Sequence, residues 1–260
     1  ISITLKSLAN RRIGTVALLG FASGLPLALT GGPLQAWMAV EGVDLKTIGL
    51  FSLVGLPYAL KFFWAPLLDR FTLPFLGRRR GWILVTQFAL MGLIFLLGLT
   101  SPQNTPWLVA LLALLLTFTS ASQDIVIDAY RADVLREKER GLGAAVSVTG
   151  YRIAMLTSGA VALILSDSLG WRLTYMLMAC LMLIGSVATF IGPEPEYAAR
   201  PPDSLKEAVS GPLTEFFDRP SSWAFLALII LYKIGDAFAG SLTTAFLIRG
   251  PGFSVVEVGA

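Results

Sequence analysis

Six ionisable side chains lie inside long apolar stretches of this sequence: Lys61, Asp124, Asp128, Arg152, Lys233 and Asp236. A charge in the middle of a lipid bilayer costs about 2.5–3.5 kcal/mol on insertion scales. Such residues therefore pair with one another or line a polar interior, where they carry protons or bind a solute. A histidine-based metal site or catalytic relay is excluded, because the 260 residues contain no histidine, and the single cysteine, Cys180, lies in an apolar run.

Asp124 and Asp128 are four residues apart, so they lie on one face of a helix. Two interpretations of Asp124 remain open. It carries a coupling proton, or it forms a structural ion pair with Arg152 or Lys61. Asp128 is expected to be structural and to belong to a charge lock, or gate, on the cytoplasmic side of the membrane with Asp69, Arg70, Arg78 and Arg131.

The buried cations also have two interpretations each. Arg152 lies near the middle of its apolar stretch. It could bind a solute carboxylate with two hydrogen bonds, or it could pair with Asp124, and the two contacts could also alternate between conformational states. Lys61 could contact a solute or extend to the membrane surface. Lys233 and Asp236 are three residues apart, so they could form a local ion pair. Because they lie inside an apolar stretch, they could instead belong to a solute site or to a second site for the coupling proton.

Uncharged residues beside these charges could complete a binding site. Trp37 could stack on a sugar ring or act as an aromatic anchor at the membrane interface. Gln35 and Gln123 supply amides that hydrogen-bond hydroxyl or amide groups. The expected site needs no metal and no cofactor, and its coupling ion would be a proton.

The elements that carry these residues are predicted to be membrane-spanning helices. Hydrophobic residues make up 55% of the chain and charged ones 14%, and a span needs about 20 mostly apolar residues. Seven stretches qualify: 13–40, 45–68, 82–99, 107–130, 142–165, 172–191 and 223–248. The first should bend near Pro26 and Pro33, and Gly20 and Gly24 should allow close helix packing. The sequence therefore predicts an all-α polytopic membrane protein.

Positive charge alternates between the connections of these helices. Basic residues precede the first span and follow the second, fourth and sixth, whereas the opposite connections hold only Lys46, Arg172 and Arg249. Basic loops stay in the cytoplasm, so the N-terminus is predicted to be cytoplasmic. Residues 192–222 form the longest connection, rich in proline and then amphipathic, which predicts a helix along the membrane surface. The expected domains are a six-helix bundle (1–191), this linker (192–222) and a first helix of a second half (223–260).

The seventh span and its exit loop are expected to be a second copy of the first. Residues 42–49 and 252–259 share glycines at both ends and a helix-capping residue, Asp44 or Ser254. Two short turns could also share this chemistry by chance. If the repeat is real, a second half of the fold would follow residue 260, and its absence would leave the binding cavity incomplete.

Residues 65–70, Ala-Pro-Leu-Leu-Asp-Arg, and 77–80, Gly-Arg-Arg-Arg, resemble the loop of the major facilitator superfamily, Gly-x-x-x-Asp-Arg followed by Gly-Arg-Arg. The chain departs from that pattern at Ala65 and in the inserted residues 71–76. Longer strings resemble the AmpG-type muropeptide permease family; they lie at 20–30, 34–38, 44–49, 120–126 and 235–239. The fold that this resemblance implies is the N-terminal six-helix half of a facilitator plus the seventh transmembrane helix.

The same resemblance implies a function. Members of this family import N-acetylglucosaminyl-1,6-anhydro-N-acetylmuramyl peptides across the bacterial inner membrane, driven by protons, for cell-wall recycling, with an indirect link to β-lactamase induction. The partners would be that solute, the lipid bilayer and a second half of the fold, with no nucleic acid. Two alternatives remain: a facilitator of another solute such as acetyl-CoA, and a non-transporting receptor on the same fold. An enzyme is disfavoured, because the chain lacks histidine, a Gly-x-Ser-x-Gly motif and a metal-ligand cluster.

Overall fold

The computed structural model describes residues 10–195 and 202–249, apart from the side chains of residues 236–249. Every regular element within those ranges is a helix. The chain divides into two compact units, Ile1–Leu205 and Lys206–Ala260, and the division falls inside the predicted linker. In the described part, five stretches are long and apolar enough to cross a membrane: Arg11–Val40, Leu45–Phe63, Arg80–Gly98, Pro106–Val134 and Glu137–Ile191.

The first stretch is broken, as predicted. Helix α2 (Arg11–Leu29) contains Pro26 one turn before its end, and α3 (Gly32–Val40) begins after a short turn with a proline in its first positions. Proline removes a backbone donor from α2 and is well placed at the start of α3, so the chain changes direction between them.

The second stretch is less regular than the single predicted span 45–68. It consists of α4 (Leu45–Leu50), η1 (Phe51–Gly55), α5 (Leu56–Leu60), η2 (Lys61–Phe63) and α6 (Ala65–Arg70). Pro57 and Pro66 each begin a new helical piece, and the two η segments are 3₁₀ turns, which fit such breaks. Asp44 caps α4 as predicted: its side chain accepts the Thr47 N–H at 3.0 Å, and the hydrogen bonds from Thr47 lower the pKa of Asp44.

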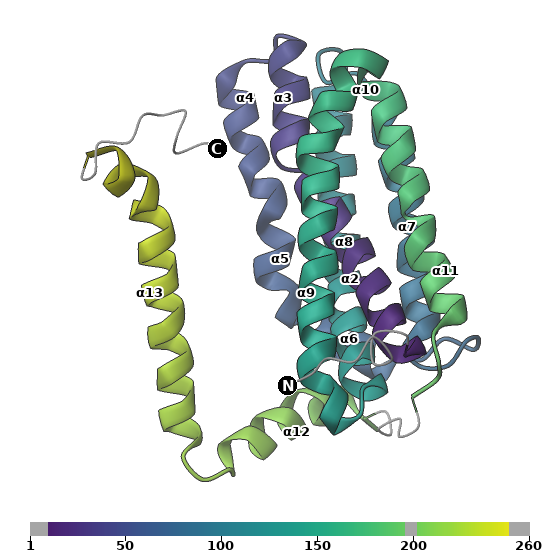
Figure 1. Cartoon of the computed structure of the whole chain (residues 1–260), viewed down its shortest axis with the longest axis vertical. Helices are drawn as coiled ribbons and strands as arrows, with labels where there is room; N and C mark the ends of the chain where they lie inside the picture. The colour runs from purple at the N-terminus through teal and green to yellow at the C-terminus, as the bar shows by residue number, and fades with distance from the viewer. Residues whose placement is uncertain (1–9, 196–201, 250–260) are drawn as a thin grey trace. The chain divides into compact units, whose positions relative to one another are not determined.

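The remaining crossings use longer helices. They are α7 (Arg80–Gly98), α8 (Pro106–Val134), η3 (Glu137–Glu139), α9 (Arg140–Leu156), the π-helical η4 (Thr157–Val161), α10 (Ala162–Leu181) and α11 (Leu183–Ile191). Gly170 lies inside α10 with φ 76°, a backbone conformation that favours glycine, and the chain reverses there (Figure 1). The stretch Glu137–Ile191 therefore crosses twice, in agreement with the predicted spans 142–165 and 172–191.

Helix α2 packs closely against α9 along much of its length. A Cβ at Gly20 would collide with the backbone oxygen of Ser147, and one at Gly24 with that of Tyr151. The two helices approach this closely only because glycine has no side chain, as predicted. Helix α2 also packs against α8 and α11, and α8 against α7, so α2 and α8 are covered on several sides.

The second unit contains α13 (Ser222–Arg249) and all of α12 (Leu205–Phe217) except its first residue. Leu205, Val209 and Leu213 form an exposed stripe along α12, which agrees with the predicted amphipathic helix. Phe217 packs against Phe216 and Trp223, with ring centroids 5.2 and 4.7 Å apart, where α12 passes into α13. The proposed repeat at 252–259 lies outside the described residues.

Candidate functional site

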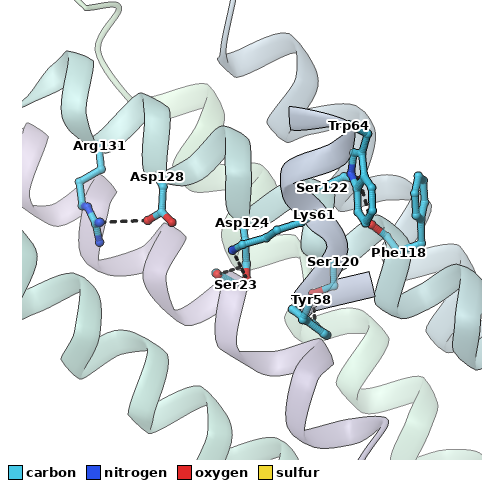
Figure 2. A network of polar contacts seen from close by, with 10 residues as sticks. All are labelled: Ser23, Tyr58, Lys61, Trp64, Phe118, Ser120, Ser122, Asp124, Asp128 and Arg131. Carbon is cyan, nitrogen blue, oxygen red and sulfur yellow. Dashed lines mark hydrogen bonds and ion pairs between the residues drawn. The ribbon is translucent and has the colours of Figure 1, made fainter. Parts of the chain in front are cut away.

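Asp124 is the centre of a polar site formed by three helical segments (Figure 2). Its side chain is 13% exposed on α8, and Ser23 of α2 donates its hydroxyl to Oδ1 at 2.5 Å. Lys61, at the start of η2, places Nζ 3.9 Å from Oδ2 and is 35% exposed. One carboxylate therefore has a hydroxyl donor and a cation from two other elements, an arrangement that can bind and release a proton.

Uncharged hydrogen bonds fix the irregular second stretch beside α8. Tyr58 donates its hydroxyl to Ser120 Oγ at 2.8 Å, and the Trp64 indole N–H donates to Ser122 Oγ at 3.0 Å (Figure 2). Hydrogen bonds between helices stabilise their association where water is scarce. These bonds lie on either side of Lys61 in the sequence, and so they place its ammonium group toward Asp124.

The structure distinguishes between the two cations considered for Asp124. Lys61 makes the ion pair, and Arg152 makes none with any described residue. The Arg152 side chain is exposed on α9. It lies less than two helical turns before the π-helical segment η4 begins. Its guanidinium is therefore not held by an ion pair with any described residue in this conformation.

The uncharged candidates divide into one exposed and two buried residues. Gln35 is exposed on α3. Gln123 is fully buried on α8 and donates its side-chain amide to Ala22 O at 3.2 Å. Trp37 is 3% exposed; its ring stacks on Trp171, with centroids 5.8 Å apart, and its indole N–H donates to Glu41. Neither Gln123 nor Trp37 offers a free surface to a solute in this conformation.

The predicted pair in the seventh span is only partly described. Lys233 is exposed on α13. The Asp236 side chain lies outside the described residues, so the structure does not test the contact between them.

Acidic and basic side chains join the ends of α6, α7 and α8. Arg79 is buried and bridges Asp69 (2.6 Å) and Asp133 (3.3 Å). Arg78 donates to the backbone oxygen of Asp69 at 2.8 Å, and burial and the neighbouring Arg79 lower the pKa of Arg78. Arg70 instead lies over the ring of Phe71, 5.8 Å from its centroid.

Asp128 contacts Arg131, another member of the predicted gate, rather than the Asp69–Arg79–Asp133 cluster. Arg131 lies three residues later on α8, and its guanidinium is 3.0 Å from the Asp128 carboxylate (Figure 2). Arg131 also donates to Ser147 of α9 at 3.3 Å. Asp69 and Asp128 therefore bind different arginines. Arg79, which binds Asp69, is more deeply buried than Arg131.

Four contributing residues were not singled out from the sequence: Ser23, Tyr58, Arg79 and Asp133. Arg79 lies in the basic run 78–80 at the start of α7, and Asp133 lies two residues after Arg131 at the end of α8. A charged residue at the end of a predicted helix was therefore a usable signal for both. Ser23 lies in the string 20–30 that carries the family resemblance, but no residue spacing marks Ser23 or Tyr58 as a partner of the site. Among the described side chains, no three acidic or cysteine residues come together in a way that could hold a metal ion.

A sequence profile described as Major Facilitator Superfamily matches residues 16–260. The chain belongs to the major facilitator superfamily. Its helical stretches make it a multi-pass membrane protein of that superfamily.

Individual relatives are also similar. The chain is 56% identical to the anhydromuropeptide permease of Escherichia coli K12 over 95% of this chain and 51% of the relative, and equally so to that of E. coli O157:H7. An uncharacterised protein of Haemophilus influenzae is 40% identical over 96% of this chain and 60% of its own length. The chain thus spans about half the length of the E. coli relatives it matches.

Proposed function

We propose that this chain is half of a permease that imports N-acetylglucosaminyl-1,6-anhydro-N-acetylmuramyl peptides, driven by protons, for cell-wall recycling. The observation that carries the proposal is the 56% identity to the E. coli anhydromuropeptide permease over 95% of the chain. By the same similarity, import would indirectly influence β-lactamase induction.

The site supports proton coupling at Asp124. A carboxylate that is largely buried, yet within reach of a partly exposed cation, changes its proton affinity when that cation moves. Lys61 is such a cation, 3.9 Å away. The peptide stem of the solute carries carboxylates, and Arg152 is exposed and without an ion pair among the described residues, which suits it to bind one. Gln35, Lys233 and Asp236 remain candidates for the same path.

We infer that the N-terminus faces the cytoplasm of a bacterium and that the protein lies in the inner membrane. Support comes from the basic side chains that gather where α2, α7 and α9 begin: Arg11, Arg12, Arg78, Arg79, Arg80 and Arg140. Basic segments stay on the cytoplasmic side. The Asp69–Arg79–Asp133 cluster would then be a cytoplasmic gate.

We further infer that transport needs a second half of the fold. Solute sites in facilitators lie between two halves, and the E. coli relatives are about twice as long as this chain. Residues 1–191 would be the first bundle, 192–222 the linker, and 223–260 the start of the second half. The transporting protein, called here the two-half protein, joins this chain to such a half.

The test is uptake of labelled anhydromuropeptide into right-side-out vesicles that contain the two-half protein. We expect accumulation when the outside is acidic, loss of accumulation when an ionophore collapses the gradient, and competition by unlabelled anhydromuropeptide but not by acetyl-CoA. No uptake above vesicles without the protein, or competition by acetyl-CoA alone, would contradict the proposal.

A further inference from the structure

Pro26 leaves a backbone carbonyl without its helical partner inside the bundle. In a regular α-helix the carbonyl of Ala22 would accept the N–H of residue 26, but proline has no N–H. Ala22 is fully buried, so water cannot replace the lost donor. Proline is tolerated in membrane helices when a neighbouring side chain supplies that donor.

Gln123 supplies it. Its side chain is fully buried on α8 and donates Nε2–H to Ala22 O at 3.2 Å. The opposite orientation of the amide would bring two acceptor oxygens together, so donation is the orientation that chemistry allows. The other amide atom, Oε1, has no partner among the described residues, which leaves donation to Ala22 as the contact that holds this side chain.

This hydrogen bond lies directly beside the carboxylate site. Ala22 precedes Ser23 on α2, and Gln123 precedes Asp124 on α8. Ser23 donates to Asp124 while Gln123 donates to Ala22, so two adjacent hydrogen bonds of opposite direction join the same two helices. Any displacement of α2 at its proline therefore changes the contact between Ser23 and Asp124.

We propose that Gln123 is a positioning residue, which satisfies the carbonyl freed by Pro26 and thereby holds Ser23 against Asp124. This replaces the role in solute binding expected from the sequence. The hydrogen bond itself can be tested without a solute, and only its effect on uptake rests on the proposed function.

The hydrogen bond is tested by a double-mutant cycle on the thermal unfolding of the two-half protein in detergent, with Gln123→Leu, Pro26→Ala and both. Gln123→Leu should lower Tm. Pro26→Ala restores an N–H at position 26, so in that background the same change should lower Tm by less than half as much, because the Ala22 carbonyl no longer depends on the amide. An equal loss of Tm in both backgrounds would overturn the proposal.

Gln87→Leu is the matched control. Gln87 is as buried as Gln123, on α7, but neither of its amide atoms has a partner among the described residues. Its substitution should change Tm equally in the Pro26 and Pro26→Ala backgrounds. A coupling to Pro26 as large as that of Gln123 would show that the cycle reports general packing, and it would overturn the assignment.

The positioning role is tested by uptake. Gln123→Leu should reduce the maximal rate of proton-driven uptake by about tenfold with little change in KM, because the interaction lost is not with the solute. In the Pro26→Ala background, Gln123→Leu should reduce the maximal rate by threefold or less. A raised KM with an unchanged maximal rate would instead indicate contact with the solute and overturn the role. If the wild-type protein takes up no anhydromuropeptide, the proposed function fails, while the thermal cycle still decides on the hydrogen bond.

Discussion

At the scale of single residues, Lys61 and Arg152 differ in a way that their sequence positions do not reveal. Both are cations in apolar stretches and both were candidates to pair with Asp124. Lys61 lies 3.9 Å from that carboxylate, whereas Arg152 is exposed without an ion pair in the described part of the chain. We therefore assign the ion pair to Lys61 and the free cation to Arg152.

This difference predicts that replacing Lys61 lowers the stability of the protein, whereas replacing Arg152 weakens uptake of the solute without lowering stability. Lys61→Met leaves the Asp124 carboxylate without its cation and should lower the free energy of unfolding by about 1 kcal/mol, a modest value because Lys61 is partly exposed. Asp124→Asn should remove most of that penalty in the double variant. Arg152→Met should leave the unfolding midpoint in detergent unchanged and raise KM for uptake. A destabilisation by Arg152→Met that Asp124→Asn relieves would contradict the assignment.

At the scale of elements, the approach of α2 to α9 depends on the absence of side chains. Gly24→Ala would place a Cβ against the backbone oxygen of Tyr151, which cannot move without its helix. We expect a loss of about 2 kcal/mol in stability, measured as a lowered unfolding midpoint. Gly14→Ala on the same helix is the control: a Cβ there meets no atom within 4 Å, and stability should stay equal or rise. Equal effects at the two positions would contradict this packing.

Helix α12 carries an apolar stripe that we expect to lie on the lipid surface. Val209 and Leu213 are exposed, and the aromatic residues Phe217 and Trp223 follow where α13 begins. A fluorophore attached to cysteine in the Val209→Cys variant should be quenched by brominated lipids. The same fluorophore in the Ser210→Cys variant should be quenched by aqueous iodide, in both cases after Cys180→Ala. Protection of position 209 from both quenchers would show that protein covers the stripe instead.

The sequence indicated some of these elements correctly for physical reasons. Proline and glycine set the break between α2 and α3, and an aspartate caps α4, because these effects are local. Pairing across helices was harder. Spacing gives the relative directions of Asp124 and Asp128 on α8, but not the rotation of α8 against its neighbours. For that reason the partner of Asp124 stayed open, and the contacts of Arg79 with Asp69 and Asp133 were not predicted, whereas the Asp128–Arg131 contact joins two members of the predicted gate.

At the scale of the whole molecule, the bundle holds the Asp124 carboxylate between segments that contain proline. Asp124 contacts α2 through Ser23 and the irregular second stretch through Lys61. Both segments are interrupted by proline, so both can change shape without breaking a continuous helix. The proposed proton coupling at Asp124 would act through these two proline-containing segments.

The most direct test of this account compares two modes of transport by Asp124→Asn in proteoliposomes of the two-half protein. In the first, an imposed proton gradient drives accumulation of labelled anhydromuropeptide. In the second, labelled solute exchanges for unlabelled solute without any gradient. The account predicts that the variant loses accumulation and keeps exchange, because the solute path is intact while the proton has no site to bind. Accumulation at the wild-type level would show that Asp124 is only structural and would contradict the central claim.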